Sequence, residues 1–129
     1  MEHLNKYIQR YQEFAKFDDI NLEERILAVP EEKHYWVTEL AKKLHEKRVL
    51  TKAKKRIKEA LILQKIDSGI VVLNKSTLDS IEEDEKLEDI KEKLENCEEA
   101  VHYLEYIVKN VVFIGNDIKN IISWKQLNE

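Results

Sequence analysis

The chain has 129 residues, which suits a single domain, and its formal net charge is −4. Two glycines, one proline and 37% charged residues favour long helices over a turn-rich β protein, so we expect an all-α fold. The single cysteine, Cys97, excludes an internal disulfide, and no N-terminal apolar run resembles a signal peptide or a membrane span. These features predict a cytoplasmic protein that does not contact a membrane.

The first half of the chain predicts a short helix and a long one. Apolar residues at spacings of three and four indicate an amphipathic helix over residues 1–17, and turn-forming residues 18–21 end it. Residues 22–29 have apolar side chains suited to a half-turn or a short helix. Pro30 and the two glutamates after it predict the start of a long basic helix that reaches Ile66, because proline suits the first helical position and acids suit the positive end.

The second half predicts a connector and another long helix. Within the connector, residues 67–81, a β-branched run at 70–73 predicts one short strand. Ser76 and Ser80 are candidate N-caps for the helix that follows. From residue 82 onward, apolar residues alternate steps of three and four, which is the heptad pattern of a coiled coil. We therefore predict one domain with four segments, namely residues 1–29, 30–66, 67–81 and 82–129.

The C-terminal half of the last helix is apolar around most of its circumference. Beside the heptad seam a second apolar set begins at Ala100 and includes Tyr106, Phe113 and Trp124. A chain of this size has too few other elements to cover such a helix, so we predict that copies of the chain associate through it. The predicted interface residues are Val101, Leu104, Val108, Val111, Ile114, Ile118 and Ile122.

Charge is distributed unevenly along the chain. Residues 42–65 hold ten lysines and arginines against two acids, whereas residues 79–99 hold eleven acids against three lysines. Rows of cations on a helix suit a phosphate backbone, because each neutralised phosphate releases counterions. The alternative is a solvated face that pairs with the acidic segment. The candidate DNA-binding residues are Lys47, Arg48, Lys52, Lys54, Lys55, Arg56 and Lys58.

Three other features suggest sites but have simpler explanations. Tyr35 and Trp36 could stack on bases, but the apolar stripe that begins at Trp36 favours core packing. Two Glu-x-x-His pairs have the spacing of di-iron ligands, without the further inward-facing glutamates that such a site needs. The chain has no Gly-rich phosphate loop. We expect no enzymatic activity, no metal and no cofactor. The two pairs are Glu31 with His34 and Glu99 with His102.

Several segments together resemble the UvsY family of phage recombination mediators. Residues 103–110 (YLEYIVKN) and 117–125 (DIKNIISWK) are similar to the family patterns YLE-x-I-[IV]-K and IK-x-x-I-x-W. Residues 19–24 (DINLEE) and the Ser68-Gly69 pair that closes the basic helix add to the likeness. Two departures are Ile66-Asp67, where the family often has two tyrosines, and Ile114, where an arginine is common.

The resemblance implies a non-enzymatic accessory of DNA recombination, repair and replication in the cytoplasm of an infected bacterial host. Such proteins bind single-stranded DNA and form ring-like homo-oligomers, for which six or seven subunits are expected. Their protein partners are a UvsX-type recombinase and the phage single-strand binding protein, and they help to load the first onto strands covered by the second. The alternative function is a coiled-coil structural adaptor that does not bind DNA.

Overall fold

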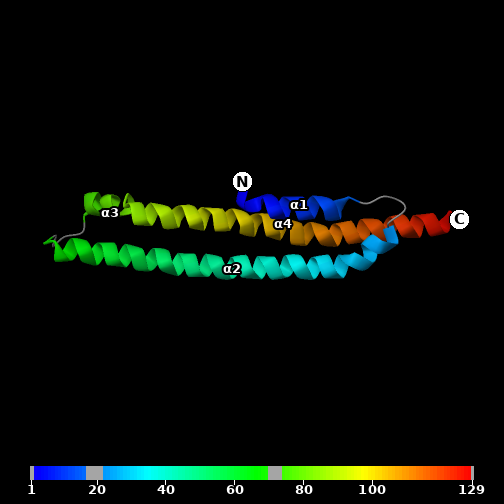
Figure 1. Ribbon diagram of the computed structural model, residues 1–129, viewed down its shortest axis with the longest axis horizontal. Helices are drawn as coiled ribbons and strands as arrows, with labels where there is room; N and C mark the ends of the chain where they lie inside the picture. The colour runs from blue at the N-terminus through cyan, green and yellow to red at the C-terminus, as the bar shows by residue number, and fades with distance from the viewer. Residues whose placement is uncertain (1, 17–21, 70–73, 129) are drawn as a thin grey trace. The chain divides into compact units, whose positions relative to one another are not determined.

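A computed structural model of the chain describes residues 2–16, 22–69 and 74–128. Its elements, in chain order, are η1 (Glu2–Leu4), α1 (Asn5–Ala15), α2 (Leu22–Asp67), α3 (Lys75–Glu82) and α4 (Glu85–Leu127) (Figure 1). These residues contain no strand, which confirms the all-α class. The predicted turn at 18–21 and the predicted strand at 70–73 lie outside the described residues. None of the described helices is both long and apolar enough to cross a membrane.

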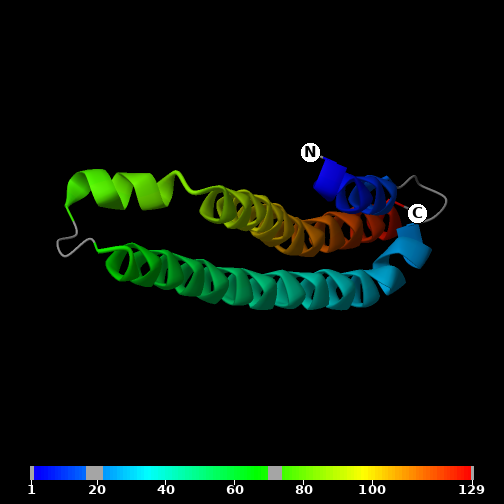
Figure 2. The same cartoon turned by 60° about the vertical axis from the view of Figure 1, so that its left-hand side comes forward.

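The long basic helix begins earlier than the sequence predicted. α2 starts at Leu22, and Pro30 lies inside it. The predicted start at Pro30 was therefore wrong, and the short helix considered for residues 22–29 is the first part of α2. An internal proline removes one N–H donor and crowds the preceding turn, and the first turns of α2 bend away from the rest (Figure 2). Burial of Leu22, which is 4% exposed, favours continuing the helix despite this cost.

α3 occupies the second half of the stretch predicted as a connector, residues 67–81, and ends one residue beyond it. Its N-cap is Asn74, whose side-chain oxygen accepts the backbone N–H of Thr77 at 2.9 Å. At the start of α4 the Asp84 carboxylate accepts a backbone N–H in the same way, at 2.9 Å. The predicted caps were wrong, because Ser76 and Ser80 both lie inside α3, where the backbone is already helical.

The described chain divides into two compact units, and both long helices contribute to each. We call residues 1–43 and 100–129 the terminal unit, and residues 44–99 the central unit. Each unit has its own apolar core. A single domain for the whole chain stays a prediction.

The core of the terminal unit forms where α1, α2 and α4 meet. Figures 1 and 2 both show α1 beside the C-terminal half of α4. Trp36 is fully buried there, meets the Tyr7 ring edge-on at 6.1 Å, and donates from Nε1 to Glu32 at 3.0 Å. α4 passes so close to α2 that a Cβ on Gly115 would lie 3.1 Å from the Val29 side chain. The buried residues are Leu4, Tyr7, Phe14, Trp36, Ala100, Leu104, Ile107 and Val111.

The core of the central unit draws on α2, α3 and α4. Leu61, Ile81, Leu87 and Ile90 are buried in it. Partly buried residues of α2 pack against them at helical spacing. One side of α2 therefore contacts the core, and the opposite side faces solvent. These partly buried residues are Leu50, Ala53, Ile57 and Ile62.

Candidate nucleic-acid interface

Four of the seven candidate DNA-binding residues lie together on the solvent side of α2. Arg48, Lys52 and Lys55 follow one another at steps of four and three, and Arg56 is one turn from Lys52, which places all four on one face of the helix, away from the packed side. All four side chains are exposed. We call them the outward basic row: Arg48, Lys52, Lys55 and Arg56.

The outward basic row carries four charges that no described acidic side chain neutralises. Within residues 2–16, 22–69 and 74–128, none of the four side chains forms an ion pair. From its first to its last residue the row spans about 12 Å along the helix, at about 1.5 Å per residue. At its N-terminal end is an open hollow that also has apolar lining. The residues that line it are Leu44, Lys47, Arg48, Thr51 and Lys52.

The other three candidates, Lys47, Lys54 and Lys58, are half-buried beside the packed side of α2. Lys58 is the one that meets the acidic segment, because its Nζ lies 2.7 Å from a carboxylate oxygen of Glu82. The alternative interpretation of the basic run, pairing with the acidic segment, therefore holds for Lys58. Lys47 and Lys54 form no ion pair with any described residue.

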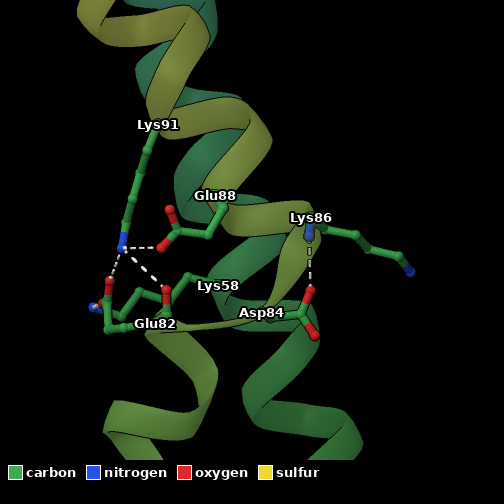
Figure 3. A network of polar contacts seen from close by, with 6 residues as sticks. All are labelled: Lys58, Glu82, Asp84, Lys86, Glu88 and Lys91. Carbon is green, nitrogen blue, oxygen red and sulfur yellow. Dashed lines mark hydrogen bonds and ion pairs between the residues drawn. The ribbon is translucent and has the colours of Figure 1, made fainter.

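Glu82 joins two lysines from different helices (Figure 3). The Nζ of Lys91, on α4, lies 2.6 Å from the second carboxylate oxygen of Glu82 and donates to the Glu82 carbonyl at 3.2 Å. Hydrogen bonds from Lys58 and then from Lys91 lower the pKa of Glu82 to about 2, and the hydrogen bond to Glu82 raises the pKa of Lys91. We call Lys58, Glu82 and Lys91 the Glu82 junction.

The aromatic side chains considered for base stacking are not on an open surface. Trp36 is fully buried, which confirms the core interpretation. The Tyr35 ring is half-buried, and the Arg10 guanidinium lies 3.5 Å from its centroid. Moreover, every Phe, Trp and Tyr of the chain lies in residues 1–43 or 100–129. The central unit, which holds the outward basic row, can therefore contact a strand through its phosphates but offers no aromatic platform.

The seven predicted interface residues all lie on α4 and line its inward side. Val101, Leu104, Val111 and Ile118 are buried within the single chain, and Val108, Ile114 and Ile122 are half-buried. The exposed apolar residues of α4 are a different set, so contacts between copies on this helix would have to use these. Sequence reasoning had noted most of them as a second apolar row. They are Tyr106, Val112, Phe113, Trp124 and Leu127.

The two Glu-x-x-His pairs lie on different helices, one on α2 and one on α4. Among the residues that the structure describes, no group of three or more His, Cys, Asp or Glu side chains is placed to hold a metal ion. Comparison of the chain with protein-family models, curated proteins and solved structures gave no match. The resemblance to the UvsY family stays a prediction from the sequence.

Proposed function

We propose that this protein is a recombination mediator that binds single-stranded DNA and has no catalytic activity. In this role it helps to load a UvsX-type recombinase onto strands covered by the phage single-strand binding protein, and it acts as a ring-shaped homo-oligomer joined through α4. The observation that carries the proposal is the outward basic row. Four exposed cations on one helix face, with no ion-pair partner in the described part of the chain, suit a polyanion.

The chemistry of the row favours a strand of any sequence. Lysine and arginine contacts to phosphate carry no base information, and the central unit has no aromatic residue to stack on bases. A row of about 12 Å contacts only a short run of phosphates, so one chain alone would bind weakly. Several copies that present the same row would gain avidity of roughly 10² or more over a single row.

The second candidate function is a structural adaptor in which the basic helix only balances the acidic segment. The ion pair between Lys58 and Glu82 favours it, since one cation of the run is used in that way. In that case the exposed cations would be solvated and replaceable without effect on a DNA ligand.

Removal of two row charges separates these functions. We expect Lys52→Ala with Arg56→Ala to weaken binding of a labelled single-stranded oligonucleotide for all base compositions alike. The plot of log affinity against log salt should become shallower by about 1.4, from roughly 0.7 per lost contact. Fluorescence anisotropy at several salt concentrations measures both quantities, and alanine preserves the helix.

The matched control removes two exposed lysines outside the basic segment, Lys33→Ala with Lys75→Ala, and changes net charge by the same amount. The control should keep a slope close to that of the unmodified chain. Equal slopes for both double variants would assign the binding, if any, to overall charge and would refute the role of the row.

A further inference from the structure

The Glu82 junction places two cations from separate helices around one anion. Lys58 on α2 and Lys91 on α4 each contact a different oxygen of the Glu82 carboxylate, at 2.7 and 2.6 Å. Figure 3 shows the Lys91 side chain directed at Glu82 and Glu88, the latter at a longer distance of 4.0 Å. The two ammonium groups are therefore held close together in a position set by two helices.

Such a pair of ammonium groups has the chemistry of a phosphate site. A phosphodiester, like a carboxylate, carries one negative charge and offers two equivalent oxygens that accept charge-assisted hydrogen bonds. Lys58 also lies one turn beyond Lys54 and close to the end of the outward basic row. A strand that follows the row would therefore pass near the two lysines.

We infer that Lys58 and Lys91 form a latent phosphate site, that Glu82 fills it in place of a strand phosphate, and that this internal anion confines strand binding to the outward basic row. The inference deepens the proposed function and rests on it. It assigns to Glu82, which the sequence did not single out, the role of limiting how many phosphates one chain contacts.

Exchange of Glu82 for a strand phosphate does not make the free energy of strand binding more favourable. One anion would replace another of equal charge, and the released carboxylate would remain beside the incoming phosphate and repel it. Glu82 also belongs to the same chain as the lysines, so its contact needs no association step. Because the pKa of Glu82 is lowered to about 2, protonation does not empty the site at any pH used to study DNA binding.

The test is neutralisation of Glu82 in the full chain, as Glu82→Gln, followed by oligonucleotide binding at several salt concentrations. The one additional phosphate that the two lysines bind should make the salt slope steeper by about 0.7 and the affinity at low salt higher. The control is Glu83→Gln, which removes the same charge from the neighbouring exposed residue, a side chain with no ion pair among the described residues. Equal slopes for the two variants would overturn the inference.

A second variant keeps the test valid even if Glu82→Gln folds poorly. Lys58→Ala in the otherwise unmodified chain should leave the salt slope unchanged, whereas Lys55→Ala, in the outward row, should lower it by about 0.7. In the Glu82→Gln background, Lys58→Ala should now lower the slope by about 0.7 as well. A slope that falls with Lys58→Ala in the unmodified chain would refute the masking by Glu82.

The binding experiments give different results if the latent phosphate site is wrong and if the proposed DNA-binding function is wrong. If the unmodified chain binds oligonucleotide and the Glu82 variants behave as their controls do, the latent site is refuted and the proposed function stands. If no variant binds oligonucleotide, the proposed function fails. The latent site is then judged with inorganic polyphosphate, a polyanion without bases, to which Glu82→Gln should bind with a steeper slope than Glu83→Gln; equal slopes would refute it.

Discussion

Tryptophan occurs twice in this chain, in opposite environments. Trp36 is completely buried against Tyr7 and Tyr35, whereas Trp124 is 65% exposed near the end of α4. A buried indole needs a partner for its N–H, and the Glu32 carboxylate accepts that hydrogen bond at 3.0 Å. The position of Trp36 at the start of an apolar stripe was enough to predict its burial. No local pattern could reveal that Arg10, from another helix, covers the neighbouring Tyr35 ring.

Loss of the Trp36 side chain should be the most damaging single change in the terminal unit. We expect Trp36→Ala to lower the free energy of unfolding by about 3 to 5 kcal/mol, because the cavity has no other side chain large enough to fill it. Urea denaturation followed by circular dichroism measures the change. The control is Val37→Ala, the next residue of α2, which is 43% exposed and should change stability by about 0.5 kcal/mol or less. Similar losses for both variants would contradict the packing described for Trp36.

At the scale of whole elements, periodicity predicted the helices well and their ends poorly. The heptad seam from Leu87 to Ile122 does form one continuous helix, α4. Helix ends depend instead on single hydrogen bonds, and several residue types can supply them. Ser76 and Ser80 were the candidate N-caps, yet Asn74 and Asp84 cap α3 and α4. Pro30 had the features of a helix start, but tertiary burial of Leu22 carried α2 past it.

The Asn74 cap should matter for α3, since eight residues are too few for a helix to be stable by propensity alone. We expect Asn74→Ala to lower the free energy of unfolding by about 1 kcal/mol. Asn74→Asp keeps an oxygen that can accept the Thr77 N–H, so it should retain most of the stability. Chemical denaturation of the three proteins provides the measurement, and equal stabilities for the alanine and aspartate variants would show that the cap contributes nothing.

The candidate site could be predicted from the sequence at the level of the helix but not of the individual residue. Composition indicated a basic segment, and all seven candidates lie on one helix. Which cations remain available depends on contacts between distant segments, and only the structure reveals that Glu82 reaches Lys58. The same limit applies to α4, because a heptad seam has the same sequence pattern whether the chain's own helices or a second copy cover it.

For the whole molecule, the exposed apolar residues of α4 decide how self-association should be tested. Leu104 is fully buried in the single chain, so a charge at Leu104 would unfold the terminal unit and reveal nothing about assembly. Phe113 and Trp124 are 52% and 65% exposed, so charges there leave the core intact. They are therefore the residues to change, and loss of assembly in such a variant can be attributed to the surface.

We expect the unmodified chain to sediment as a closed oligomer and Phe113→Glu with Trp124→Glu to sediment as a smaller species with unchanged helix content. The control is Leu27→Glu with Leu63→Glu, which adds the same charges at apolar residues of α2 that are 80% and 59% exposed. This control should keep the oligomer.

The smaller species should also bind a long single strand roughly 10²-fold more weakly or worse, because linked rows gain avidity that one row lacks. An unchanged mass for the α4 variant would refute association through this surface. An unchanged mass combined with weaker strand binding would instead indicate that the two aromatic side chains contact bases directly.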